Sequence, residues 1–206
     1  MRSYFIKTPS IVMQIFSNYT WRFLSDKKEI FLTFDDGPIP VVTEFILDIL
    51  QKHQVKATFF CVGENIKKYP TIYNRIVNEG HQTGNHTYNH LNGWKTKTDK
   101  YIANVEKCRS VQESLLFRPP YGKITKKQAT ILIEKGYKII MWRLLSGDFD
   151  INNDPKKCYQ NITNNIKSGD IIVFHDNIKS QEKILQILEK TITTLKNKGY
   201  NFKAIR

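Results

Sequence analysis

Short apolar runs alternate with amphipathic stretches along most of the chain, and this alternation limits the possible folds more than any other feature. The runs predict strands at 29–35, 57–62, 81–86, 115–118, 138–145, 170–174 and 200–205, of which 81–86 is the weakest. The stretches between them have helical periodicity, at 41–52, 65–79, 98–113, 125–135, 155–167 and 181–198. Several end at a glycine, a common helix stop. Seven strands alternating with about six helices predict an α/β protein with a parallel sheet.

The length of 206 residues favours a single-domain barrel over an open doubly wound sheet. We assign residues 29–206 to this barrel and residues 1–28 to an N-terminal segment that packs on it. That segment has early positive charge and an apolar patch interrupted by Gln14, Ser17 and Asn18, with no small-residue cleavage site after it. The alternative is a degenerate export signal or a membrane-surface helix. Because the segment lacks a clear signal-peptide pattern, a cytoplasmic location is favoured, with the cell envelope as the other possibility.

The net charge and the cysteines limit the partners of the chain. The charge is +13, but the lysines are scattered, which favours a generally positive surface over a nucleic-acid site. Helix-turn-helix, zinc-finger and ribonucleoprotein motifs are not found, so no nucleic-acid partner is expected. Cys61, Cys108 and Cys158 are too widely spaced for a disulfide framework or a CxxC metal site, so free buried thiols are expected. The sequence leaves the oligomeric state open and favours a monomer.

Titratable side chains follow five of the predicted strands, at the point where each strand ends. They are Asp35 and Asp36, His86 and His90, Arg118 with Tyr121, Asp148, and His175 with Asp176. In parallel α/β folds the chemistry lies at the carboxyl ends of the strands. Five strand ends that each carry such groups are difficult to explain by packing alone, so this edge of the sheet is the expected active site.

His86 and His90 have i, i+4 spacing, which can direct both imidazoles to one point on a helical turn or at a turn-to-helix junction. A carboxylate from another strand end completes the two-His, one-Asp set of a catalytic zinc site. Asp35 and Asp36 are neighbours on a strand and point to opposite sides. One of them can therefore bind the metal while the other stays near the bound water as a general base.

Three further residues surround this set. Arg118 could hold Asp35 as a carboxylate through a bidentate bond, and the peptide N–H of Tyr121 could donate to an oxyanion. His175 follows a buried strand and is a candidate general acid, whose pKa a carboxylate such as Asp148 could raise. His53 and His81 have no such neighbours in the sequence, and we interpret them as surface or structural residues.

Five ordered motifs resemble those of the polysaccharide deacetylases, the NodB-homology domain of carbohydrate esterase family four. The motifs are TFDDG at 33–37, H-T-x-x-H at 86–90, R-x-P-Y at 118–121, Asp148-Phe149 and V-x-H at 173–175. The resemblance implies a distorted (β/α)7 TIM-like barrel and metal-dependent hydrolysis of acetyl groups on sugars. It also implies that a metal-activated water, deprotonated by a base, attacks the acetyl carbonyl.

The resemblance further implies a role for each matching residue. Asp35 corresponds to the catalytic base, and Asp36, His86 and His90 correspond to the metal ligands. Arg118 would orient the base, Tyr121 would stabilise the oxyanion and His175 would be the acid. Phe149 and Val173 correspond to the apolar walls that hold the acetyl methyl group.

The chain departs from the family pattern at the fourth motif, where many members have Asp-x-x-Asp-Trp and this chain has Leu145-x-x-Asp148-Phe149. The first acidic position is lost and an indole becomes a phenyl ring. Asp148 must therefore act alone to steady either Arg118 or His175, and the sequence leaves both possibilities open.

The expected substrate is an acetylated glycan, and the expected activity is deacetylation of N-acetylated sugars of chitooligosaccharide or peptidoglycan type. The expected cofactor is a divalent metal ion, first of all Zn²⁺, with Co²⁺, Ni²⁺ or Mn²⁺ as alternatives. Two other functions remain open from the sequence: an O-acetyl esterase acting on xylan or another acetylated glycan, and a non-catalytic glycan-binding relative. Membrane association is also left open.

Overall fold

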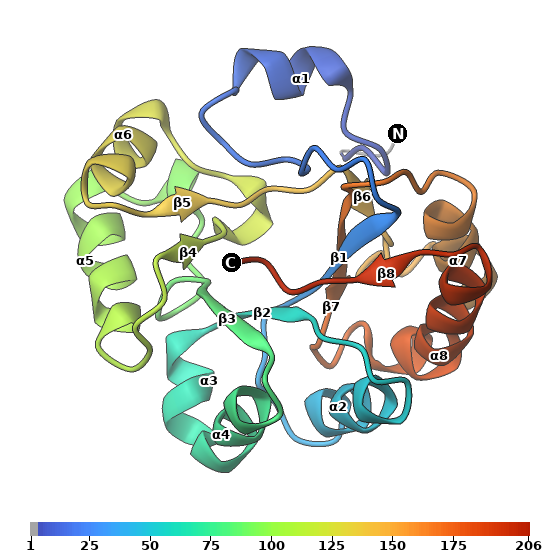
Figure 1. The fold of residues 1–206 in the computed structure, drawn as a ribbon. Coiled ribbons are helices and arrows are strands. Elements are labelled where there is room, and N and C mark those ends of the chain that lie inside the picture. The colour runs from blue at the N-terminus through green and yellow to red at the C-terminus, as the bar shows by residue number, and fades with distance from the viewer. Residues whose placement is uncertain (1–3) are drawn as a thin grey trace.

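The strands of the computed structural model, which describes residues 4–206, form one curled parallel sheet inside a ring of helices (Figure 1). The strand order is β5-β4-β3-β2-β1-β7-β6. The strands are β1 (Glu29–Asp35), β2 (Thr58–Cys61), β3 (Gln82–Asn85), β4 (Leu116–Phe117), β5 (Lys138–Ile139), β6 (Leu144–Leu145) and β7 (Ile171–His175), and β8 (Asn201–Phe202) pairs with the start of β1. This sheet confirms the predicted single-domain α/β barrel.

Helices cover the outer face of the sheet (Figure 1). They are α2 (Val42–Lys52), α3 (Gly63–Lys68), α4 (Pro70–Asn78), α5 (Thr98–Arg109), α6 (Lys126–Glu134), α7 (Pro155–Thr163) and α8 (Gln181–Asn197). The stretch 65–79, expected as one helix, is divided into α3 and α4 because Pro70 lacks the N–H that would continue the first helix. Proline is favoured instead at the first position of α4. No helix within residues 4–206 has the length and the apolar character needed to cross a membrane.

The predicted strand 138–145 is two strands at opposite edges of the sheet. Its first half, β5, pairs with β4, and its second half, β6, pairs with β7. The chain therefore crosses from one edge to the other between Ile140 and Arg143. This crossing distorts the barrel, and it leaves the carbonyls of Ile140 and Met141 to bond with a side chain, that of Arg118.

The N-terminal segment bonds to this crossing (Figure 1). The Thr20 N–H donates to the Ile139 carbonyl at 2.8 Å, and the Thr20 carbonyl accepts from the Met141 N–H at 2.7 Å. Thr8 and Ile6 bond in the same way to Arg143 and Leu145. The segment also contains a short helix, α1 (Ser10–Ile15), that the sequence analysis did not predict. Residues 1–3 of the segment assigned to 1–28 lie outside the described range.

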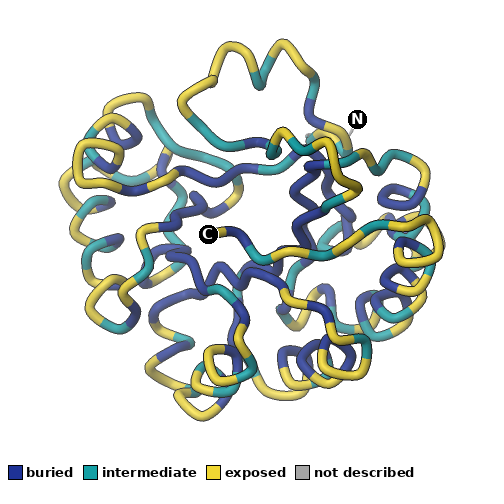
Figure 2. The backbone as a smooth tube through the Cα atoms, in the orientation of Figure 1, coloured by how far each residue is buried: buried dark blue, intermediate teal, exposed yellow. Residues whose placement is uncertain are grey.

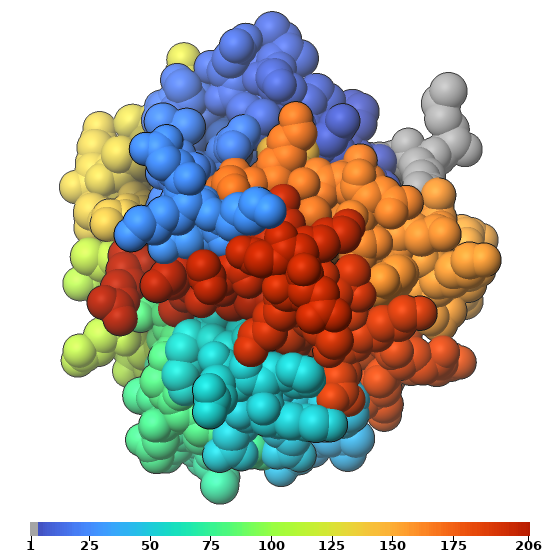
Figure 3. Space-filling model, turned by 45° about the vertical axis from the view of Figure 1, so that its right-hand side comes forward, coloured from blue at the N-terminus to red at the C-terminus, as the bar shows by residue number. Residues whose placement is uncertain are grey.

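Alternation along the central strands separates two apolar layers. Ile30, Leu32 and Phe34 of β1 pack in the cluster beneath the helices, whereas Phe31 belongs to a cluster inside the barrel. Figure 2 shows this buried interior surrounded by exposed helix faces. The C-terminal residues lie at the amino ends of the strands, where the Ile205 N–H donates to Thr58 Oγ1 at 2.9 Å. Figure 3 shows the C-terminal part of the chain, in red, on the surface of the molecule. Ile205 is buried in the same cluster as Phe31, at the end of the barrel opposite to the predicted site residues.

Gly169 is the position where we expect a glycine substitution to be most destabilising. It has φ +81°, and an added Cβ would lie 1.7 Å from the Phe23 carbonyl oxygen. Gly199 has a similar φ of +80°, but its nearest neighbour would be a Lys28 side-chain atom at 3.7 Å. Left-handed backbone costs a non-glycine residue about 1–2 kcal/mol. Gly199→Ala should therefore lower the free energy of unfolding by about 1 kcal/mol, and Gly169→Ala by about 3 kcal/mol because strain adds to the clash.

Urea unfolding of the two variants beside the wild type measures this difference. Equal losses would show that the Phe23 backbone moves aside without cost. In that case the N-terminal segment is held less firmly against the barrel than its hydrogen bonds indicate.

Candidate active site

Asp36, His86 and His90 converge at the carboxyl ends of β1 and β3. Asp36 Oδ1 lies 2.9 Å from His90 Nε2 and 3.4 Å from His86 Nε2. One ligand atom from each residue lies within 4.8 Å of the others, so the three residues could hold a metal ion. The structure thus brings together the three residues predicted as ligands.

The imidazoles of His86 and His90 are brought together by an irregular turn with left-handed residues. They do not lie on a helical turn. Residues 86–92 are irregular, with φ +61° at Thr87 and +54° at His90. The Asn85 side chain accepts from the Thr87 N–H at 2.9 Å and fixes this turn. The expectation of a helical turn or a turn-to-helix junction is therefore wrong, because side-chain bonds here replace a helical ladder.

The two aspartates separate for a similar reason. Asp35 is the last residue of β1, whereas Asp36 has φ +89° and has already left the strand. The Asn65 side chain donates to the Asp36 carbonyl at 2.8 Å and stabilises this turn. The sequence analysis predicted that strand alternation directs the two carboxylates apart. That prediction is wrong, because Asp36 lies outside the strand.

The hydrogen bonds around the three residues are those of metal ligands. His86 Nδ1 donates to the Arg118 carbonyl at 2.7 Å, and this bond orients the ring so that Nε2 lies toward Asp36. Asp36 Oδ2 accepts from Asn177 Nδ2 at 2.5 Å. Burial of Asp36 opposes its ionisation, but the hydrogen bonds from His86 and His90 hold its pKa well below the usual value. A carboxylate and two oriented imidazoles fit a divalent cation.

Arg118 is fully buried beside the Asp35 carboxylate. Its Nη1 donates to Asp35 Oδ1 at 2.6 Å and to Thr33 Oγ1 at 2.7 Å. Its other nitrogens donate to the carbonyls of Ile140 and Met141, at 3.1 and 3.0 Å. The expected bidentate pair is therefore wrong, because the carbonyls exposed at the β5–β6 crossing take the remaining donors. The guanidinium holds Asp35 by a single charged bond.

Asp148 bonds to His175, which answers the question that the sequence left open. Its Oδ1 lies 2.8 Å from His175 Nδ1, and its Oδ2 accepts from the His175 N–H at 2.7 Å. Burial opposes protonation of the imidazole, but the carboxylates of Asp148, Asp36 and Asp35 raise its pKa to about 9. Arg118 donates to Asp35, Thr33 and two backbone carbonyls, and none of these hydrogen bonds goes to Asp148.

The remaining predicted site residues lie around these groups. The Phe149 ring lies 5.0 Å from the His175 ring, and the Tyr121 ring lies 4.6 Å from the His90 ring. Tyr121 is exposed, with φ +61°. Val173 is fully buried in the layer below His175, in register with Thr33 and Leu145.

The sequence analysis gave no role to four residues that support the site. Thr33 accepts from Arg118, and Asn177 donates to Asp36. Asp176 accepts from the Gly37 N–H at 2.9 Å and from Thr43 Oγ1 at 2.7 Å. Lys183 donates to the carbonyls of Asp148 and Asp150 at 3.0 and 2.6 Å. Thr33 opens the TFDDG motif, and Asp176 and Asn177 directly follow His175 in VFHDN, so three of the four residues were marked by position in the sequence, whereas Lys183 was not.

A parallel barrel with an Asp–Arg pair, a His–Asp pair and a candidate metal cluster at the carboxyl ends of its strands has the architecture of a hydrolytic enzyme. The family model described as "Polysaccharide deacetylase" matches residues 24–140. The chain belongs to this family. The sequence analysis predicted that the chain is a polysaccharide deacetylase and a hydrolase that acts on carbon–nitrogen bonds. Both predictions are confirmed.

Several relatives are named for their activity on peptidoglycan. A peptidoglycan-N-acetylglucosamine deacetylase from Bacillus cereus is 35% identical over 189 residues, which cover 89% of each chain. A peptidoglycan-N-acetylmuramic acid deacetylase from Bacillus subtilis is 33% identical and covers 87% of this chain and 70% of its own. The crystal structure of a peptidoglycan N-acetylglucosamine deacetylase, in complex with a substituted N-oxidanyl-benzamide, superimposes with a TM-score of 0.88. It is 34% identical and covers 96% of this chain and 95% of its own.

Proposed function

We propose that this chain removes acetyl groups from the N-acetylated sugars of a peptidoglycan-type glycan. In this proposal Asp35 is the base, His175 is the acid, and Asp36, His86 and His90 hold a divalent cation, with zinc as the preferred ion. The observation that carries the proposal is the pairing of Asp35 with His175 in register across β1 and β7. Each has its own oppositely charged partner, and both lie beside the candidate metal cluster.

A divalent cation in this cluster supplies Lewis-acid chemistry: it lowers the pKa of water and polarises a carbonyl. Asp35 accepts the proton of the attacking water, whose oxygen bonds to the acetyl carbonyl carbon. Arg118 holds the carboxylate in place, since its bonds to Thr33 and to two carbonyls fix the guanidinium. The Tyr121 N–H donates to the oxyanion that forms.

His175 completes the reaction from the other side. As the carbon–nitrogen bond breaks, its imidazolium gives a proton to the sugar nitrogen, and the products are acetate and an amino sugar. Asp148 keeps the ring oriented and protonated before this step. Phe149, which is partly exposed, faces the acetyl methyl group, and the fully buried Val173 supports the pocket from the layer below His175. The relatives named for N-acetylglucosamine and N-acetylmuramic acid support the choice of an amide substrate.

The test is mass spectrometry of the products from three substrates: N-acetylated chitooligosaccharide, peptidoglycan fragments and acetylxylan. We expect loss of acetyl groups from the first two, abolished by chelation and restored by zinc or cobalt. Release of acetate from acetylxylan alone would instead make the chain an O-acetyl esterase.

His90→Ala should lower metal affinity by about 100-fold or more, because one of three ligands is lost. The matched control is His53→Ala, since His53 bonds to Glu189 on α8 and lies outside the cluster. Equilibrium dialysis against zinc measures both variants. Equal metal affinity in the two variants would remove His90 from the ligand set.

A further inference from the structure

Two loops beside the candidate active site, each taken together with the first turn of the helix that follows it, carry an excess of lysine. Residues 91–100 and 121–130 contain six lysines and one acidic residue, Asp99. The lysines are Lys95, Lys97, Lys100, Lys123, Lys126 and Lys127, and all but Lys123 are exposed. Such a local excess attracts anions and raises their concentration near the surface.

The two loops are joined to each other. The Gly93 N–H donates to the Lys123 carbonyl at 3.1 Å, and Trp94 Nε1 donates to the Ile124 carbonyl at 3.1 Å. The Gln128 side chain donates to the carbonyls of Gly93 and Thr96. The two loops therefore lie side by side, and Lys97 and Lys127, one from each, line the same groove.

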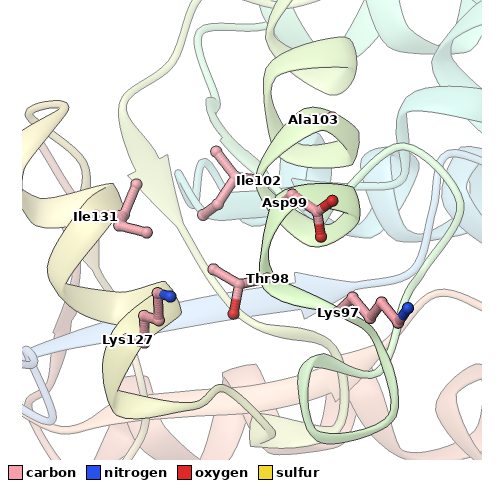
Figure 4. Close-up of a pocket in the computed structure, with 7 residues that line it drawn as sticks. All are labelled: Lys97, Thr98, Asp99, Ile102, Ala103, Lys127 and Ile131. Carbon is pink, nitrogen blue, oxygen red and sulfur yellow. The ribbon is translucent and has the colours of Figure 1, made fainter.

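Between these loops lies an open groove of about 720 Å³, at the start of α5 and α6 (Figure 4). Its lining includes the charged residues Lys97, Asp99 and Lys127 and the apolar residues Ile102 and Ile131. A helix that follows a parallel strand begins at the carboxyl end of that strand. Because α5 follows β3 and α6 follows β4, the groove opens on the same end of the barrel as the candidate active site.

Two aromatic side chains of these loops, Tyr121 and Trp94, lie beside titratable or charged groups. The Tyr121 ring contacts His90, and Lys123, two residues further on, lies 5.2 Å from the Trp94 ring. Trp94 is 64% exposed, so part of its ring is available to a ligand. Exposed aromatic rings with a polar edge are favoured at binding surfaces.

We propose that this lysine-lined groove, together with Trp94, binds a carboxylate-bearing sugar of the same glycan strand whose acetyl group is removed at the site. The inference rests on the proposed function and narrows its substrate to an anionic glycan. Charge complementarity argues for this occupant, because two of the three charged residues that line the groove are cations, Lys97 and Lys127 against Asp99. The apolar side chains of Ile102 and Ile131 in the same lining suit a sugar ring better than a small inorganic ion.

The double variant Lys97→Glu/Lys127→Glu tests the groove. Both positions lie at helix starts, where a carboxylate is favoured, so the fold is expected to be retained. The matched control is Lys27→Glu/Lys196→Glu, which makes the same change in net charge around a cavity at the opposite end of the barrel. Both variants are compared on two glycans of equal length: a neutral chitooligosaccharide and a muramic-acid-containing fragment with free carboxylates.

We expect KM for the anionic glycan to rise about tenfold in the groove variant, with kcat unchanged and KM for the neutral glycan within about twofold. Salt should raise the wild-type KM for the anionic glycan only. Equal effects in the control variant, or equal effects on the two glycans, would overturn the proposal.

Calorimetric binding of the anionic glycan to each variant provides a readout that does not depend on activity. If the groove variant binds the anionic glycan about tenfold more weakly than the wild type, the result supports the groove as a binding site. If the wild type deacetylates neither glycan, that second result refutes the proposed function and leaves the groove proposal standing. Binding that the groove variant leaves unchanged overturns the groove, whatever the activity.

Discussion

Asp35→Asn should lower turnover by about 1,000-fold or more and leave the metal content of the protein unchanged. The amide keeps the shape of the carboxylate but cannot accept the proton of the attacking water, and loss of a general base typically costs about 10²–10⁴-fold. The three candidate ligands are untouched, because Asp36 and the two histidines bond to one another and not to Asp35. Turnover and metal content are measured on the same preparation.

The same substitution should also destabilise the fold. Arg118 is fully buried, and Asp35 is the carboxylate with which it forms an ion pair. Removing one partner of a buried pair costs about 3–5 kcal/mol. The control is Thr33→Val, which removes the second acceptor of Arg118 Nη1 and keeps the base. It should lower turnover by less than about tenfold.

The metal content of the Asp35→Asn variant shows which of the two aspartates, Asp35 or Asp36, binds the metal. Loss of the metal from this variant would show that Asp35, and not Asp36 alone, is a ligand, and the assignment of base and ligand would then be wrong. Retained metal with retained turnover would remove Asp35 from the chemistry and leave it as the counter-ion of Arg118.

Much of the site could be predicted from the sequence because strand periodicity places it. Once β1, β3 and β7 are located, Asp35, His86 and His175 must lie at one end of the barrel, since parallel strands share a direction. The ordered motifs then added Arg118 and Asp148. Burial followed from composition in the same way, and the three cysteines are free and buried as expected.

The errors arose where side chains determine the backbone path. The run 138–145 has uniform strand composition, and nothing in it marks the crossing that Arg118 stabilises through two carbonyls. The turn at His90 likewise depends on Asn85, a residue of the preceding strand. Such long-range and side-chain bonds have no periodicity, so a pattern cannot reveal them.

Asp148→Asn should shift the alkaline limb of the pH–rate profile to lower pH by about 2 units. His175 must carry a proton to act as the acid, and its pKa is about 9 in the wild type, although burial of the ring opposes protonation. The Asp148 carboxylate is the largest of the opposing causes, and an uncharged amide removes it. A cation bound at Asp36 lowers the pKa of His175 in both proteins. The displacement between the two profiles, and not their absolute position, is therefore the quantity to measure.

Stability gives a second readout with a defined sign. The pKa of His175 is higher in the folded chain than its ordinary value of 6.5, so protonation stabilises the fold fully below about pH 6.5. That contribution is lost as the pH rises through about 9. The difference in unfolding free energy between wild type and Asp148→Asn should therefore be largest near pH 6 and shrink toward pH 10.

A purely structural role for Asp148 predicts another result. The variant would then lose the same stability at every pH, and its activity would fall without a change in the shape of the profile. His175→Ala serves as the reference, because it removes the titrating ring and the alkaline limb with it. Since Arg118 is held by Asp35, Thr33 and two carbonyls, Asp148 is free to act on His175 alone. The fourth motif can therefore lack its first acidic residue and still support a protonated acid.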